Sequence, residues 1–115
     1  MIVGGDYDHP QVVKPNSAYS DDCGKTWKES SHRPAGYRWG VAVVPDTHGP
    51  TVFAVGPTGT DYSLDRGKNW KQMNEEDTNT IGFADAYRGW AVGKKGLILK
   101  FEGTVPGAVA PSLKK

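Results

Sequence analysis

The sequence has little of three things that would assign it to a familiar class: cysteine, excess charge of one sign, and long apolar segments. Its 115 residues contain one cysteine, Cys23, so no disulfide can form within the chain. Lysine, arginine, aspartate and glutamate are interspersed and give a formal charge of +1, which predicts no basic face and no nucleic-acid partner. The longest apolar run, Val41 to Val44, is far shorter than the roughly 18 residues of a spanning helix, so we expect no membrane insertion.

Other signals of location and chemistry are also weak. The N-terminus lacks the basic stretch and apolar core of a secretory signal, which predicts a cytoplasmic chain as given and otherwise leaves localisation open. We expect Cys23 in an exposed turn with no base beside it, and therefore inert. Asp6, Asp8 and His9 could offer metal ligands, but so short a cluster is more typical of a polar loop, and we interpret His48 as a surface residue. No metal and no cofactor is therefore predicted.

Glycine and proline, in contrast, are frequent and divide the chain into short pieces. There are 15 glycines and eight prolines, and no window keeps apolar residues at helical spacing, which predicts an all-β fold. The short apolar stretches indicate ten strands, near residues 2–5, 17–20, 26–29, 37–44, 51–55, 60–63, 69–72, 80–84, 89–92 and 96–101.

One octet occurs twice. "SDDCGKTW" at residues 20–27 returns as "SLDRGKNW" at residues 63–70, an offset of 43, which lies in the range of about 40 to 45 residues typical of one propeller blade. The segments "MIVGGD", "VFAVGP" and "GWAVGK" each place a short apolar run before glycine. A third, incomplete repeat therefore covers residues 89–101.

The chemistry of each octet indicates a hairpin corner. Glycine at Gly24 and Gly67 supplies the positive φ of a tight turn, and the carboxylates of Asp22 and Asp65 can accept backbone N–H groups across it. The two tryptophans that close the octets, Trp27 and Trp70, are predicted to cover the turn and to fill the space against the neighbouring sheet.

These residues carry a family resemblance. The pattern Ser-x-Asp-x-Gly-x-Thr-Trp resembles the Asp-box, or BNR repeat, of sialidase-like β-propellers. The first copy matches at Ser20, Asp22, Gly24, Thr26 and Trp27, and the second at Ser63, Asp65, Gly67 and Trp70. Asn69 replaces the threonine in the second copy, which should weaken one hydroxyl contact. "GWAVGKKGLILKF" further resembles repeats of the photosystem II stability and assembly factor group.

The resemblance implies antiparallel four-stranded blades, with the octets in a structural role on the rim. Ten strands make about two and a half blades, whereas a closed propeller needs about four or more. We therefore expect an incomplete propeller over residues 1–103, and a flexible tail over residues 104–115. Its uncovered sheets predict self-association, most simply as a dimer, unless the chain is a truncated piece of a longer propeller. Full-length relatives are often exported, as the resemblance suggests.

The segment "HRPAGYRWG" is the best candidate for binding. Tyr37 and Arg38 could point toward a central channel; alternatively, Tyr37 packs at a strand start and Arg38 pairs with a local carboxylate. Asp61 and Asp85 are interpreted as turn or strand-edge residues. The four arginines of the chain are Arg33, Arg38, Arg66 and Arg88, and none lies in a stretch that resembles the arginine motif of sialidases.

Three functions compete on this sequence. We favour a non-enzymatic binding or assembly module for a protein or glycan partner, because it needs only a rigid scaffold with exposed aromatic and arginine side chains. The second hypothesis is a propeller fragment without independent activity. The third is a sialidase-like glycoside hydrolase, which requires paired carboxylates and is disfavoured by the missing arginine motif.

Overall fold

The computed structural model describes residues 1–6, 8–11, 15–45, 51–85 and 88–101, and these residues form an all-β protein. Its strands are β1 (Ile2–Val3), β2 (Ser17–Tyr19), β3 (Lys28–Glu29), β4 (Gly40–Val43), β5 (Val52–Gly56), β6 (Gly59–Ser63), β7 (Lys71–Asn74), β8 (Thr78–Asp85), β9 (Arg88–Gly93) and β10 (Ile98–Lys100). A short 3-10 helix, η1 (Lys94–Gly96), joins β9 to β10. Each predicted strand range overlaps one of these strands, so the prediction of an all-β chain is confirmed.

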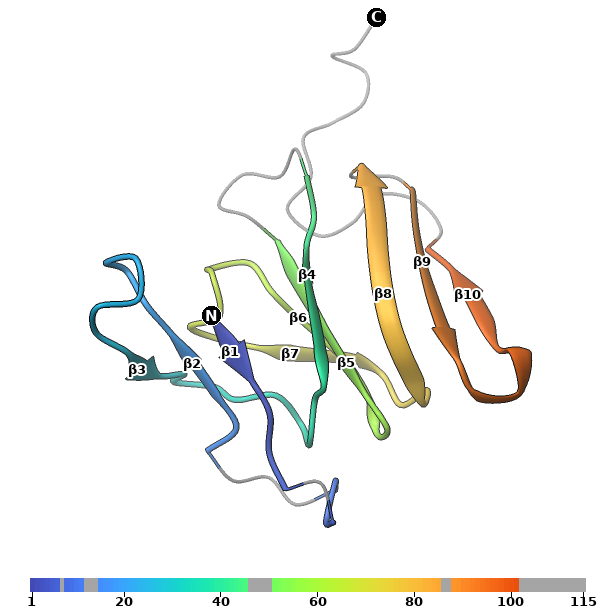
Figure 1. Cartoon of the computed structure of the whole chain (residues 1–115), viewed down its shortest axis with the longest axis horizontal. Coiled ribbons are helices and arrows are strands. Elements are labelled where there is room, and N and C mark those ends of the chain that lie inside the picture. The colour runs from blue at the N-terminus through green and yellow to red at the C-terminus, as the bar shows by residue number, and fades with distance from the viewer. Residues whose placement is uncertain (7, 12–14, 46–50, 86–87, 102–115) are drawn as a thin grey trace, which may run out of the picture.

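The strands form three antiparallel sheets that lie side by side in the order of the chain (Figure 1). The first sheet is β1-β2-β3, the second is β4-β5-β6-β7, and the third is β8-β9-β10. Strand partners are always neighbours in sequence, as in a meander of hairpins. The molecule is flat, with principal extents of 47 × 39 × 18 Å, and the described residues do not close the three sheets into a ring.

The second sheet lies between the other two, and β5 is its most buried strand, with all five residues inaccessible. Successive side chains of a strand point to opposite faces. Val52 and Ala54 therefore share one face, where they pack with Trp70 against Met1 and Val3 of the first sheet. This contact joins the first two sheets.

Phe53 points from β5 to the opposite face, toward the third sheet. Its ring centroid lies 5.0 Å from that of Phe83 and 5.9 Å from that of Phe101, and Tyr62 of β6 packs beside it at 6.0 Å. Ile81 completes this cluster from β8. A strand covered on both faces needs apolar side chains at every position, which explains the unbroken apolar run of β5.

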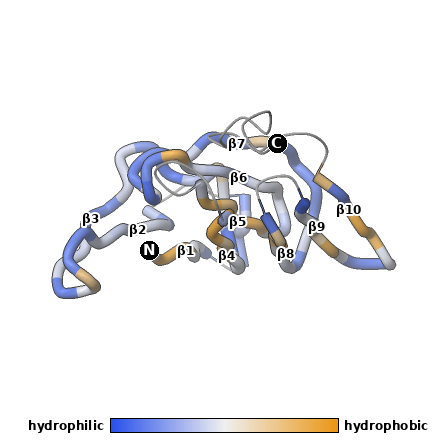
Figure 2. Tube along the Cα trace, turned by 90° about the horizontal axis from the view of Figure 1, so that it is seen from above, coloured by the Kyte–Doolittle hydropathy of each residue, from blue (hydrophilic) through white to orange (hydrophobic). Residues whose placement is uncertain are grey.

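The hydropathy of the chain follows this arrangement. In Figure 2 the hydrophobic parts of the tube lie on β1, β5, β9 and β10, where the sheets face one another or face outward. Most of the connecting segments are hydrophilic, with short hydrophobic stretches such as the one in the loop beside β3. Within the described ranges, no helix is long and apolar enough to cross a membrane.

Candidate functional site

The first octet connects β2 to β3 through a compact network. Ser20 Oγ donates to Asp22 Oδ1 at 2.8 Å and accepts from the backbone N–H of Gly24 at 2.8 Å. Asp22 also accepts from the backbone N–H of Thr26 at 2.8 Å and from the Thr26 hydroxyl. The bond from that hydroxyl, followed by the other donors, lowers the pKa of Asp22 to about 2. The predicted role of this carboxylate is confirmed.

The second octet connects β6 to β7 with the same bonds. Ser63 Oγ donates to Asp65 Oδ1 at 2.8 Å and accepts from Gly67 N at 2.9 Å. Asn69 N donates to Asp65 Oδ1 at 2.9 Å, and Asn69 Nδ2 donates to Oδ2 at 2.7 Å. Burial raises the pKa of Asp65, but the bonds from Asn69 and Ser63 outweigh it, so this pKa lies below its ordinary value. The amide of Asn69 donates where the first octet has the hydroxyl of Thr26, so the network of the turn is kept.

The two turns also have the same backbone. Gly24 has φ of +88° and Gly67 has φ of +91°, as the sequence predicts, and the residues before them, Cys23 and Arg66, have φ of +61° and +64°. Two successive left-handed residues therefore turn the chain at each corner. Cys23 is exposed at its corner, which confirms its predicted place in a turn.

The tryptophans that close the octets have different surroundings. Trp70 is only 7% exposed, because its ring packs against the first sheet at Met1 and Val3. Trp27 is 44% exposed, so the prediction that it fills space against a neighbouring sheet is wrong. The reason is positional: no sheet formed by the described residues precedes the first one. Trp27 Nε1 instead donates to its own turn at Gly24 O, at 3.1 Å.

The predicted binding residue Arg38 lies inside the protein. Its side chain has no exposed surface, and Nε donates to Asp61 Oδ2 at 2.7 Å, with Asp61 itself 1% exposed. Nη1 donates to Tyr37 O at 2.8 Å and to Thr58 Oγ1 at 2.9 Å, while Nη2 is buried without a hydrogen-bond partner. This geometry matches the alternative in which Arg38 pairs with a local carboxylate.

The segment before β4 is held to the second sheet by this ion pair and to the first sheet by Asn16, the residue before β2. Asn16 Nδ2 donates to the carbonyl oxygens of Pro34 and Gly36 at 3.1 and 2.8 Å, and Ala35 N donates to Asp61 Oδ2 at 3.2 Å. Gly36 is required here, since a Cβ would lie 2.6 Å from Pro10 O. The segment therefore presents its side chains in a fixed orientation.

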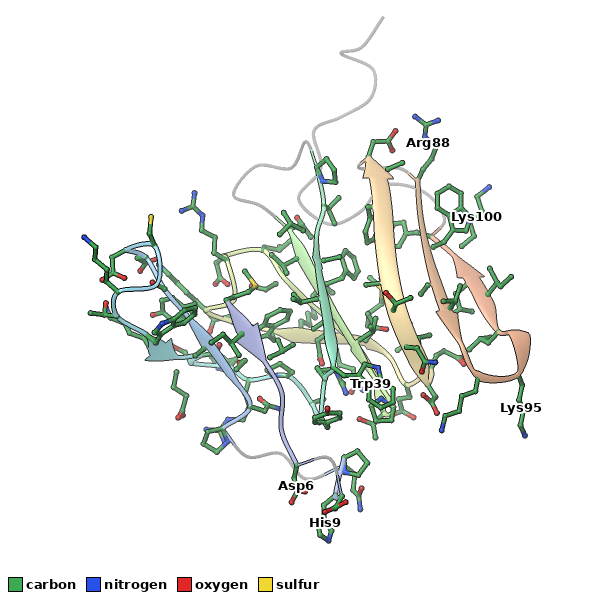
Figure 3. The ribbon with its side chains drawn as sticks, in the orientation of Figure 1. Asp6, His9, Trp39, Arg88, Lys95 and Lys100 are labelled. Carbon is green, nitrogen blue, oxygen red and sulfur yellow. The ribbon has the colours of Figure 1, made fainter. Side chains whose placement is uncertain are left out.

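A cleft of about 660 Å³ opens at the end of the molecule where this segment enters β4. Its lining comes from loops and strand ends of all three sheets: Asp8, Pro10, Trp39, Pro57, Asn79 and Lys94. Trp39 is fixed there by a hydrogen bond from Nε1 to Thr78 O at 2.9 Å and by an edge contact with the Tyr37 ring at 5.7 Å. Figure 3 shows Trp39 at the same end as Asp6 and His9.

The cleft offers a partly exposed indole ring, one carboxylate, one amide and one ammonium group. Such a set can stack against a ring and bind hydroxyl or charged groups around it. Tyr37 contacts Trp39 from behind, but neither Tyr37 nor Arg38 lines the cleft. The sequence reasoning did not identify Trp39 as a candidate. The pattern Tyr-x-Trp just before a strand could have indicated it, because residues two apart lie on the same side of a strand end.

Comparisons with known families, curated proteins and solved structures found no match.

The other residues considered from sequence have local roles. His9 Nδ1 lies 3.1 Å from Asp6 Oδ2, and this hydrogen bond lowers the pKa of Asp6. Asp85, the last residue of β8, accepts from Arg88 Nε at 2.9 Å. Asp61 lies in the middle of β6, an inner strand, and is buried by its pair with Arg38, so its interpretation as a turn or strand-edge residue is wrong. In the described part of the chain, no three His, Cys, Asp or Glu side chains form a group that could hold a metal ion. His48 and residues 104–115 lie outside the described residues.

The two terminal sheets each leave an apolar face open. On the third sheet, this surface consists of Trp90, Val92, Ile98 and Lys100, and we call it the Trp90 face. On the first sheet, it consists of Ile2, Ala18, Trp27 and Glu29, and we call it the Trp27 face. The Trp27 face borders a depression of about 380 Å³. Apolar side chains gathered in this way are typical of interaction surfaces.

Proposed function

We propose that the chain is a non-enzymatic binding or assembly module of the β-propeller type, which self-associates through its open sheet faces and holds a protein or glycan partner. Three antiparallel sheets stacked in chain order support the comparison with successive blades. The matching hydrogen-bond networks of the two octets support their interpretation as Asp-boxes. On this interpretation, the first and third sheets are incomplete blades.

One observation carries the proposal: the third sheet presents Trp90 at the position where the second sheet has Phe53. "VFAVG" in β5 and "GWAVG" in β9 align residue by residue, and Phe53 pairs with Tyr62 as Trp90 pairs with Lys100. Phe53 is fully buried by the next sheet, whereas Trp90 is 43% exposed. Trp90 is thus an aromatic side chain that is exposed at a position where the second sheet buries one. An exposed aromatic residue of this kind is what an assembly module requires.

The charged groups that a glycosidase would use serve the scaffold instead. Three arginines pair with nearby carboxylates: Arg33 with Glu29, Arg38 with Asp61, and Arg88 with Asp85. Among the described residues that line the cleft, Asp8 is the one carboxylate, whereas glycoside hydrolysis uses two. These features favour binding over catalysis.

Molar mass in solution tests the self-association. Light scattering behind a sizing column, at a series of protein concentrations, should give a defined multiple of 12.5 kDa, with a dimer as the simplest case. A mass of one chain at every concentration would refute self-association. It would leave the second hypothesis, a propeller fragment without independent activity.

The glycan part of the proposal is carried by Trp39. Stacking of a sugar ring on the indole should change tryptophan fluorescence when the protein is titrated with a panel of neutral and acidic oligosaccharides. Trp39→Ala should abolish the change, and Asn79→Ala should weaken it, since the amide lines the same cleft. Fluorogenic glycosides should remain intact in the same solutions. Their hydrolysis would favour the glycosidase hypothesis, and the absence of any response across the panel would leave a protein as the partner.

A further inference from the structure

We propose that the Trp90 face of one chain binds the Trp27 face of a second copy, head to tail. This inference rests on the proposed self-association. It identifies the partner as a second copy of the chain and specifies which two faces meet. It follows from the direction in which the three sheets stack. The second sheet meets the third sheet with one face, which we call its forward face, and the first sheet with the other, which we call its backward face.

The forward faces are equivalent in the three sheets. The offset of 43 residues aligns Ala18 with Asp61, and Ile2 pairs with Ala18 as Ala54 pairs with Asp61. Met1, the residue before Ile2, is therefore the counterpart of Phe53, the residue before Ala54. Met1 packs against the second sheet and Phe53 against the third. Trp90 continues this series on the third sheet, but nothing described lies in front of it. The Trp90 face is therefore a forward face that no sheet of the described residues covers.

The backward faces are equivalent as well. Trp70 belongs to the backward face of the second sheet and packs with Ala54 against the first sheet. The same alignment makes Trp27 the counterpart of Trp70, and it makes Ile2, which pairs with Ala18, the counterpart of Ala54. Both Trp27 and Ile2 are exposed. The Trp27 face is therefore a backward face that no sheet in the described part of the chain covers.

A hydrogen bond also distinguishes a covered octet from an uncovered one. In the second octet, Gly67 O accepts from Ser30 Oγ of the preceding sheet, and Trp70 Nε1 is buried without a partner. In the first octet, Gly24 O accepts from Trp27 Nε1 of its own turn. The carbonyl oxygen of Gly67 thus accepts from a neighbouring sheet, whereas the equivalent oxygen of Gly24 accepts from its own turn. No described sheet lies close enough to Gly24 to supply a donor.

One molecule therefore has one open forward face, the Trp90 face, and one open backward face, the Trp27 face. A forward face fits a backward face, as both internal interfaces show, so the interface between copies is heterologous and not a face paired with itself. Two copies joined through both pairs of faces bring together six sheets, three from each chain. Six lies within the range of about four to eight blades of closed propellers, so a closed dimer satisfies all four open faces.

Two single variants and their mixture test this pairing of the Trp90 face with the Trp27 face. Trp90→Ser disables the forward face, and Trp27→Ser disables the backward face. A head-to-tail interface needs one of each, so each variant alone should dissociate at least about 30-fold more readily than the wild type. Mixing them restores one intact interface, between the Trp90 face of the Trp27→Ser chain and the Trp27 face of the Trp90→Ser chain. With one variant ¹⁵N-labelled, native mass spectrometry should show a mixed dimer.

Control variants keep the test independent of folding. Leu64→Ser removes an exposed apolar side chain from the second octet, outside both faces, and should associate like the wild type. Ile2→Ser and Ile98→Ser change the same two faces at highly exposed positions without touching an octet, and they should reproduce the effects of the tryptophan variants. Circular dichroism confirms that each variant is folded before its mass is measured.

Three outcomes would overturn the inference, and they differ from one another. If Trp27→Ser associates like the wild type while Trp90→Ser does not, the interface pairs one face with itself. If both variants associate like the wild type, self-association uses another surface. The proposed function then stands, but the pairing of these two faces is wrong. If the wild-type chain is a monomer throughout, self-association itself is refuted.

Discussion

Removal of the Asp61 carboxylate should unfold the protein more readily than any comparable change at its surface. Asp61→Ala would leave the guanidinium of Arg38 charged and fully buried with its closest counter-ion gone. Losing one partner of a buried ion pair costs about 3–5 kcal/mol, a large share of the 5–15 kcal/mol that stabilises a typical domain. For a chain of this length, the thermal midpoint should fall by about 10 °C or more. Thermal denaturation followed by circular dichroism measures the shift.

A second change separates the burial of charge from the loss of packing. Replacing both partners, as in the double variant Arg38→Met with Asp61→Leu, removes the orphaned charge and should recover much of the stability lost in Asp61→Ala. Asp21→Ala breaks the exposed pair with Lys68, outside both open faces, and should leave the midpoint close to that of the wild type. If Asp61→Ala denatured like the wild type, Arg38 would have to reach solvent, and its assignment as a scaffold residue would be wrong.

Three further changes test the core and the octets. Phe53→Ala empties the contact between the second and third sheets and should cost about 3–5 kcal/mol in urea denaturation; a smaller loss would mean that these sheets hardly pack. The pKa of Asp22 is lowered to about 2, so its contribution is present above the unfolded value near 4 and should be lost as pH falls from about 4 to about 2. Asp22→Asn should flatten that acid limb, and an unchanged pH profile would contradict the network. Gly67→Ala forces a side chain into φ of +91° and should cost about 1–2 kcal/mol in thermal denaturation, whereas Gly4→Ala, with open space around it, serves as the control.

The strands and the octet chemistry could be predicted because both are local. Short apolar runs between glycines and prolines are enough to place a strand, and the spacing of Ser20, Asp22 and Gly24 within five residues decides which atoms meet in the turn. The turn also tolerates Asn69 for a local reason. Its amide is a donor that reaches Asp65 at 2.7 Å, in the place where Thr26 donates its hydroxyl to Asp22.

What depends on distant neighbours could not be predicted. Trp27 and Trp70 end nearly identical octets, yet their exposure differs because, among the described residues, only Trp70 has a preceding sheet to pack against. Arg38 and Asp61 are 23 residues apart, and the sequence around neither residue indicates that the two form an ion pair. The cleft at Trp39 draws on loops from all three sheets, so it exists only once the sheets are stacked.

The position of β5 has a consequence for how the molecule opens. Phe53 belongs to one hydrophobic cluster, while Val52 and Ala54 belong to the other, so the two cores share a single strand. Either outer sheet can detach while the opposite core keeps β5 in place, but β5 cannot leave without dissolving both cores. Fluctuations of the native state therefore proceed from the two ends of the chain toward its middle, and a partner bound to the Trp27 or Trp90 face would slow the detachment of that outer sheet.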